Sequence, residues 1–181
     1  MKRALIPVLL LVAAAIAAGS EFVSVRRNLA VQRTAIEAQW GELSGAFDGR
    51  ATLIAGMAED IRQSSNPQDR VFTDAANARA ALSQARAPQA KIEANEDLMN
   101  AFARLYLEAE EHPKLTASAK YRRLNEELGN AESRVAVERR KYNDLLEHYN
   151  AQLQKFPANV VAGLSGLTRI DAYVKTEQEV R

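Results

Sequence analysis

The two histidines are the residues of this chain best suited to binding a metal ion. In helical bundles, di-iron and di-manganese sites are built from paired Glu-x-x-His motifs on facing helices. The residues three positions before His112 and His148 are Ala109 and Leu145, so neither histidine completes the motif. We therefore predict no metal site, and we place His112, which follows two glutamates, at a solvated helix end.

Nucleophilic and phosphate chemistry have no better support in the sequence. The chain has no cysteine, which excludes disulfides, thiolate catalysis and cysteine-bound zinc or iron–sulfur sites. Serines and threonines are scattered without a nucleophile elbow, and no glycine-rich loop follows a predicted strand. We predict no catalytic residue and no cofactor. The enzymatic alternative is a hydrolase whose catalytic residues are distant in sequence and come together only in the fold. It predicts substrate turnover that a single polar substitution abolishes.

Charged residues interrupt two otherwise apolar helical stripes. Arg50 lies on the stripe of the first helix. If the first and last helices pair antiparallel, the numbers of facing residues add up to about 180, which places Arg50 near Glu132. Arg33 and Glu138 are further charges on these stripes. A half-buried Arg–Glu pair costs desolvation and can fix the register of two helices. We interpret the pair as structural, with a ligand site as the alternative.

Two asparagines follow two tyrosines seven residues apart. Asn143 and Asn150 come directly after Tyr142 and Tyr149, so both lie on one flank of a helix. We expect them to bond internally along the bundle, or else to bond a neighbouring helix. The predicted polar network therefore comprises Arg50, Glu132, Glu138, Asn143 and Asn150.

Three glycines are spaced four residues apart on the first long helix. Gly41, Gly45 and Gly49 point away from the Trp40–Phe47 stripe by the heptad count, toward the outer face. Glycine is unfavourable in a helix interior, and a glycine groove permits close helix approach. This stripe is the candidate surface for a homo-oligomer or another partner. The alternatives are drift without a role and an internal contact.

The elements that must position these residues are helices, punctuated by prolines at 67, 88 and 113. The predicted segments span 24–64, 68–86, 89–111 and 118–156, with Thr116 or Ser118 available to cap the last. Short loops favour antiparallel neighbours. The sequence thus predicts an all-α fold, an antiparallel up-and-down four-helix bundle.

Apolar residues recur at steps of three and four along each segment, and no alternating pattern predicts a strand. The first stripe comprises Leu29, Ile36, Trp40, Leu43, Phe47, Ile54, Met57 and Ile61. The second is rich in alanine and comprises Val71, Ala75, Ala78, Leu82 and Ala85. The third comprises Ile92, Met99, Phe102 and Tyr106. The last comprises Tyr121, Leu124, Leu128, Ala131, Val135, Tyr142, Leu145, Tyr149 and Phe156.

An apolar leader opens the chain. Lys2 and Arg3 precede an uncharged run that extends from Ala4 to Ser20. The run fits a secretory signal, with a small-x-small cleavage site at 15–17, and it is also long enough for a spanning helix. Either interpretation places the rest of the chain outside the cytoplasm. The net charge is only +1, so we predict no nucleic-acid partner.

A short apolar segment follows the last predicted helix at 160–167. It is either a short helix that closes the open end of the bundle or a segment close to the lipid surface.

Several motifs together resemble the LemA family. They are Glu111-His112-Pro113-Lys114-Leu115, Leu124-Asn125-Glu126-Glu127-Leu128 with Glu132, Arg139-Arg140-Lys141-Tyr142-Asn143, Tyr149-Asn150, Phe156-Pro157, and Trp40 followed by Arg50 and Leu53-Ile54. The resemblance covers roughly 22–167. It implies a bacterial protein with an N-terminal membrane segment and an extracytoplasmic helical bundle, and it favours an uncleaved anchor. The family has no established catalytic activity.

The first helix departs from the family pattern. Where the family usually has Asp, a second Arg, Asp, Pro and Asn, this chain has Ser44, Gly49, Thr52, Ala55 and Gly56. Any role of that polar cluster therefore does not transfer to this chain.

These patterns predict three parts: a membrane anchor or signal at 1–21, a LemA-like bundle at 22–167 and a polar tail at 168–181. We expect a non-enzymatic, single-pass protein of the bacterial cytoplasmic membrane, with its bundle on the periplasmic side. It would scaffold or modulate other envelope proteins. The alternative is a small-molecule or peptide-binding module that uses the bundle interior or the membrane-proximal end.

Overall fold

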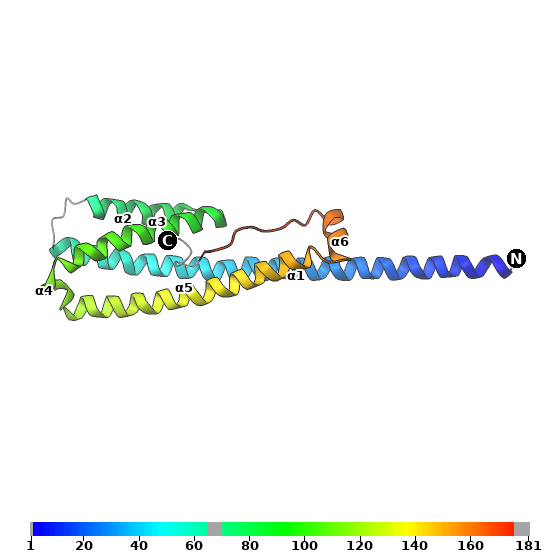
Figure 1. The fold of residues 1–181 in the computed structure, drawn as a ribbon, viewed down its shortest axis with the longest axis horizontal. Helices are drawn as coiled ribbons and strands as arrows, with labels where there is room; N and C mark the ends of the chain where they lie inside the picture. The colour runs from blue at the N-terminus through cyan, green and yellow to red at the C-terminus, as the bar shows by residue number, and fades with distance from the viewer. Residues whose placement is uncertain (1, 65–69, 176–181) are drawn as a thin grey trace. The chain divides into compact units, whose positions relative to one another are not determined.

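The computed structural model describes residues 2–64 and 70–175, with side chains from residue 9 onward. The described residues form helices and connecting segments, with no strand among them, so the all-α prediction is confirmed. The helices are α1 (Lys2–Ser64), α2 (Arg70–Gln84), α3 (Pro88–Glu110), α4 (Pro113–Thr116), α5 (Ala119–Gln152) and α6 (Ala158–Ser165) (Figure 1). The turn predicted around Pro67 lies outside the described residues.

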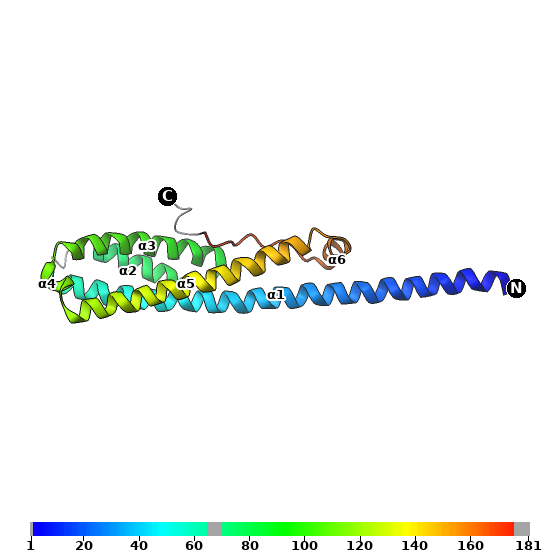
Figure 2. The ribbon, with the colours of Figure 1, turned by 60° about the horizontal axis from the view of Figure 1, so that its bottom comes forward.

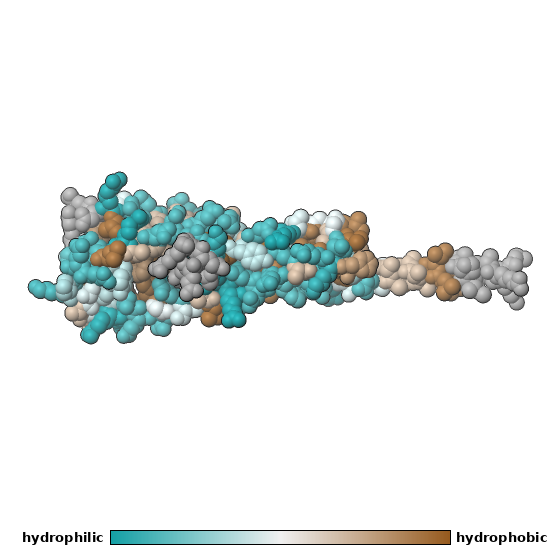
Figure 3. Space-filling view, viewed as in Figure 1, coloured by the Kyte–Doolittle hydropathy of each residue, from teal (hydrophilic) through white to brown (hydrophobic). Residues whose placement is uncertain are grey.

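Helix α1 continues without a break from Lys2 to Ser64. The predicted boundary between residues 21 and 22 therefore falls inside a helix, because the leader is rich in alanine and leucine, which favour helix, and no proline follows Pro7 before the end of α1. α1 is long and apolar enough to cross a membrane, and no side chain in its most apolar stretch is buried. A secretory signal passes the same test. The space-filling view shows the uncovered apolar surface of this stretch (Figure 3).

Proline and serine set the starts of the shorter helices. Pro88 and Pro113 each occupy the first position of a helix, where proline loses no hydrogen bond. Ser118 caps α5, since its hydroxyl oxygen accepts a 3.1 Å hydrogen bond from the Tyr121 amide. Of the two caps suggested by the sequence, the structure uses Ser118.

Helix α5 ends earlier than predicted. It stops at Gln152, and Phe156 is 83% exposed, so the placement of Phe156 in the core is wrong. Pro157 disfavours the helical conformation at the residue before it, which prevents the stripe from continuing to 156. Leu146 is fully buried, whereas the predicted Leu145 is only half-buried.

The chain forms two compact units. The first comprises Met1–Ala38 and Asn143–Asp171, and the second comprises Gln39–Tyr142 and Ala172–Arg181. Helices α1 and α5 each contribute residues to both.

The core of the second unit uses the predicted stripes. Figures 1 and 2 show the last part of α1 beside α2, α3 and the first part of α5. The ring of Trp40 lies 5.4 Å from Tyr142 and 6.4 Å from Phe47, centroid to centroid. The buried side chains include Leu43, Phe47, Ile54, Met57, Ile61, Phe72, Leu82, Leu98, Leu105, Leu128, Val135 and Tyr142.

The first unit packs α6 and the end of α5 with α1. Its buried apolar side chains are Leu29, Ile36, Leu146, Tyr149, Ala158, Val161 and Ala162. The 160–167 segment is thus largely helical, with α6 ending at Ser165 and Gly166 as the residue that caps it. Gly166 has a φ of 67°, the left-handed conformation that commonly ends helices and that glycine adopts without strain.

Candidate functional site

A buried arginine joins α1 to α3 in the second unit. The Arg50 side chain is 2% exposed, and its Nη2 donates a 2.7 Å hydrogen bond to Oδ1 of Asn95, which is also buried. Burial of a guanidinium is costly unless hydrogen bonds and charges compensate it. The bond to Asn95 therefore fixes the position of Arg50 against α3.

A second polar contact joins the same two helices one turn away. Lys91, also largely buried, places Nζ 2.8 Å from Oδ2 of Asp48. Because Asp48 and Arg50 lie close together on α1, the two contacts hold one stretch of α1 against the start of α3. The buried aliphatic part of Lys91 adds apolar contact to this ion pair.

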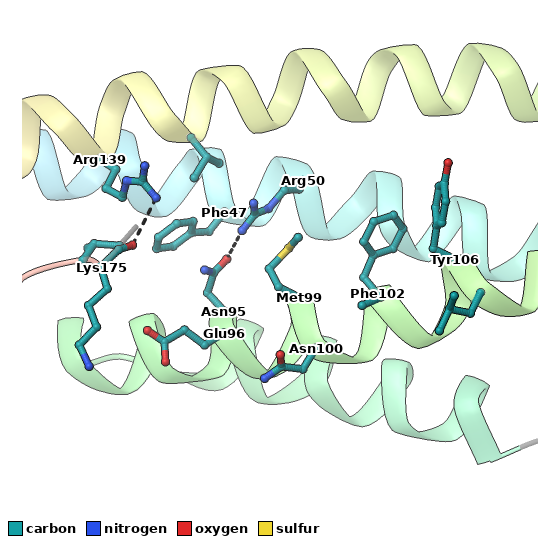
Figure 4. A pocket seen from close by; sticks show the side chains of 14 residues that line it. Phe47, Arg50, Asn95, Glu96, Met99, Asn100, Phe102, Tyr106, Arg139 and Lys175 are labelled. Atoms are coloured by element: carbon teal, nitrogen blue, oxygen red, sulfur yellow. Dashed lines mark hydrogen bonds between the residues drawn. The ribbon is translucent and has the colours of Figure 1, made fainter. Parts of the chain in front are cut away.

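A groove of about 590 Å³ opens beside Arg50, and we name it the α3 groove. Helix α3 supplies most of its wall (Figure 4). The rings of Phe102 and Tyr106 meet edge to face, with their centroids 6.1 Å apart, and Leu107 beside them is 63% exposed. The lining residues are Phe47, Arg50, Asn95, Glu96, Met99, Asn100, Phe102, Ala103, Tyr106, Leu107, Val135, Arg139, Val174 and Lys175.

Cationic groups gather at the opposite end of the α3 groove from Tyr106 (Figure 4). Arg139 of α5 donates a 3.2 Å hydrogen bond from Nη1 to the carbonyl oxygen of Lys175. This bond holds the extended segment that carries the buried Val174. Three cations, Arg50, Arg139 and Lys175, line the groove with a single carboxylate, Glu96. The groove thus combines an apolar wall with a positive end, which suits an apolar ligand segment that carries a carboxylate.

Glu138 lies on α5 and contacts α1. Gln39 donates a 2.6 Å hydrogen bond from Nε2 to Oε2 of Glu138, and Nζ of Lys141 lies 3.0 Å from Oε1 of the same carboxylate. These contacts favour the charged carboxylate, and the Gln39 hydrogen bond contributes most to lowering the pKa of Glu138 below the ordinary glutamate value. Arg33, the other predicted seam charge, is exposed and pairs with Glu37 of its own helix.

Glu132 is half-buried on α5. Its pairing with Arg50 stays a prediction. The predicted five-residue network is divided between the units, since Arg50, Glu132 and Glu138 belong to the second and the two asparagines to the first.

Asn150 bonds the extended segment that follows α6. Its Nδ2 donates to the carbonyl of Ile170 at 2.7 Å, and its Oδ1 accepts from the Ile170 amide at 3.0 Å. The hydroxyl of Tyr149 donates to the Thr168 carbonyl at 3.3 Å. Asn150 therefore pairs with backbone after α6, a partner that the sequence interpretation did not consider. Asn143 is half-buried, and its predicted bond stays a prediction.

The three glycines face outward, as the heptad count predicts. Gly41, Gly45 and Gly49 are all exposed, and a Cβ built at any of them meets nothing within 4 Å. The internal contact considered as an alternative is thereby excluded within the described part of the chain. Whether the stripe binds a partner stays a prediction.

His112 is half-buried at the end of α3 and lies 3.5 Å from Glu108. Within residues 2–64 and 70–175, no three histidine, aspartate or glutamate side chains gather as metal ligands.

Sequence reasoning missed Asn95, Lys91 and the α3 groove. Asn95 lies between Ile92 and Met99 at helical spacing, on the third apolar stripe itself. A polar residue in the middle of such a stripe is the signal that would have paired it with Arg50. Tyr106 was predicted as core and is 37% exposed, because the end of this stripe opens onto the groove.

Comparison with known proteins now identifies the class of this helical chain. The model of the LemA family matches residues 39–181, and the chain belongs to this family. The match begins at Gln39, later than the resemblance read from the motifs, and it extends through the polar tail. No curated protein matches the chain.

Proposed function

We propose that this LemA-family chain is a non-enzymatic, membrane-anchored helical-bundle protein of the bacterial envelope. Its α3 groove holds an apolar, carboxylate-bearing segment of another envelope protein. In this role the protein scaffolds or modulates its partner and catalyses no reaction.

The proposed bundle is the antiparallel up-and-down arrangement of four helices. Gln39 bonds Glu138, and Asp60 pairs with Lys120, so the numbering of α1 rises where that of α5 falls. Lys91 pairs with Asp48 while Asn95 bonds Arg50, so α1 and α3 run in the same direction. These four contacts support the alternation of directions that short connections favour.

The proposed anchor is the first part of α1. Side chains from Leu9 to Val12 are each more than half exposed, and so is Ile16, although all are apolar. Such a surface is unfavourable in water and favourable in lipid. A single-pass anchor in the cytoplasmic membrane, with the bundle on the periplasmic side, accounts for this surface.

The observation that carries the partner-binding role is the composition of the α3 groove. Exposed Leu107 and Tyr106 offer apolar contact at one end, and Arg139 and Lys175 offer charge at the other. Interfaces of this kind draw affinity from buried aromatic residues and orientation from charge. The volume also fits a small amphipathic acid, which is the second candidate ligand and predicts a ligand-dependent rise in Tm.

Photocrosslinking in cells tests the role. A photoreactive phenylalanine analogue at Leu107 faces the groove, and the same analogue at Val137, 52% exposed on α5 outside the groove lining, is the matched control. We expect a discrete membrane-protein adduct from position 107 only, and Arg139→Glu should abolish it while the helical CD signal is retained. Equal adducts at both positions, or an adduct indifferent to Arg139→Glu, would contradict the proposal.

A further inference from the structure

Helix α6 buries one side and exposes large apolar groups on another. Val161 and Ala162 are buried in the first unit. Val160 is 51% exposed and Leu164, four residues later, is 75% exposed. Phe156, two residues before the helix, is 83% exposed. We name these three exposed side chains, Phe156, Val160 and Leu164, the α6 face.

The α6 face belongs to the same compact unit as the uncovered apolar stretch of α1. Within this unit, α6 lies alongside α1 and is the element nearest that stretch (Figures 1 and 2). Along α1, Leu29 is the first buried side chain after the apolar run, which continues beyond Glu21 and ends near Val25. The packed part of the unit therefore begins about one helical turn beyond the apolar run.

Basic side chains accompany the α6 face. Lys155 directly precedes Phe156 and is exposed, and Arg26 and Arg27 are exposed on α1 at the end of its apolar run. Aromatic and aliphatic groups flanked by lysine and arginine characterise segments that lie in the headgroup region of a bilayer. A soluble partner would explain the apolar groups but not their continuity with the apolar surface of α1.

We infer that the α6 face is a second membrane contact, which inserts into the lipid surface beside the α1 anchor. The side of the first unit that carries the α6 face then lies on the bilayer. The opposite side of α6, with the buried Val161 and Ala162, packs inside the unit. The two interpretations of the 160–167 segment, a helix that closes the bundle and a segment close to the lipid surface, then each describe a different side of α6. The inference depends on the anchoring part of the proposed function and adds a contact that a single-pass anchor does not require.

Site-specific fluorescence tests this contact in the full chain. Because the chain has no cysteine, Leu164→Cys gives one attachment point for the environment-sensitive dye NBD. The labelled protein is reconstituted into phosphatidylcholine–phosphatidylglycerol vesicles, with or without lipids that carry a nitroxide near the headgroup end of the acyl chain. Val137→Cys on α5 is the control for a similarly exposed apolar position in the second unit, and Ile16→Cys reports on the anchor with lipids labelled at mid-chain.

We expect the probe at 164 to emit at shorter wavelength than the probe at 137 and to be quenched by the nitroxide lipid. The double variant Phe156→Ser, Val160→Ser should reduce this quenching without lowering Tm, because both side chains are exposed. A probe at 164 that is not quenched while the probe at 16 is quenched overturns the inference and leaves the anchor intact. A blue-shifted but unquenched probe at 164 means that protein covers the face, which also overturns it. If the probe at 16 is not quenched either, both the anchor and the inference fail.

Discussion

Arg50 Nη2 donates a 2.7 Å hydrogen bond to Oδ1 of Asn95, and both side chains, 45 residues apart in the sequence, are buried between α1 and α3. Asn95→Ala removes the acceptor from a charged donor, so we expect a loss of about 2 kcal/mol in the free energy of unfolding. Denaturant unfolding measures this loss of stability, and Asn130→Ala, at an exposed position of α5, is the control. A loss no larger than that of the control would contradict a stabilising role for the bond.

Glu132 provides a separate test of the predicted register. If Arg50 and Glu132 pair, a double-mutant cycle with Arg50→Met and Glu132→Gln should give a coupling energy of about 1–3 kcal/mol. Arg50→Ala alone should then lower Tm strongly, because the remaining carboxylate is half-buried and has lost its cation. Additive effects of the two substitutions would remove the pair from the account.

The bonds between Asn150 and Ile170 hold the segment that follows α6. Asn150→Ala removes two hydrogen bonds at a side chain that is 4% exposed, so we predict a loss of about 1–3 kcal/mol in stability. Amide hydrogen exchange at Ile170 should also accelerate, because its acceptor is gone. The exposed Asn130→Ala again serves as the matched control. Unchanged exchange at Ile170 would show that the segment is held by other contacts.

Acid should weaken the contact between Gln39 and Glu138. The hydrogen bond from Gln39 and the ammonium of Lys141 lower the pKa of Glu138, so the folded state binds a proton less readily than the unfolded state does. The stabilisation is therefore present above the ordinary glutamate pKa and is lost as the pH falls through the lowered value. The difference in Tm between the native chain and Glu138→Gln should shrink over that range. A difference in Tm that stays constant over that range would contradict the role assigned to the Gln39 hydrogen bond.

The outward glycines give a prediction that separates helix propensity from partner binding. Because a Cβ at Gly45 meets open space, Gly45→Ala should stabilise the chain by about 1 kcal/mol. Gly45→Leu should fold equally well, yet it should break any homo-oligomer that depends on close approach at this stripe. Light scattering of the detergent-solubilised chain decides the second point. An unchanged oligomeric size would leave the stripe without an interaction role.

The sequence predicted the helical positions that periodicity alone determines. The stripe from Leu43 to Ile61 is buried at every predicted position, because side chains that recur every three or four residues lie on one face of a helix and pack against the same neighbours. The pattern failed at Phe156, where proline ends helical geometry before the stripe is complete. It also selected Leu145 over Leu146, since a period of 3.5 drifts from the 3.6 of a straight helix over many turns.

The α3 groove lay beyond what the sequence pattern can predict. Its wall is made of Met99, Phe102 and Tyr106, which look like ordinary core residues in one dimension. Whether such a stripe is buried depends on which other helices pack over it. That packing is decided by the assembled unit and not by the pattern of one helix. Asn95 was the one local signal, a polar residue at a core position.

The topology of the chain tests the central claim most directly. Val137→Cys introduces the only thiol of the chain at an exposed position of α5. Intact spheroplasts are treated with a membrane-impermeant maleimide, and the membranes are then washed with alkaline carbonate. The account predicts full labelling before lysis and retention of the labelled, full-length chain in the washed pellet. Labelling only after lysis, or release of the chain into the soluble fraction, would contradict an anchored bundle outside the cytoplasm.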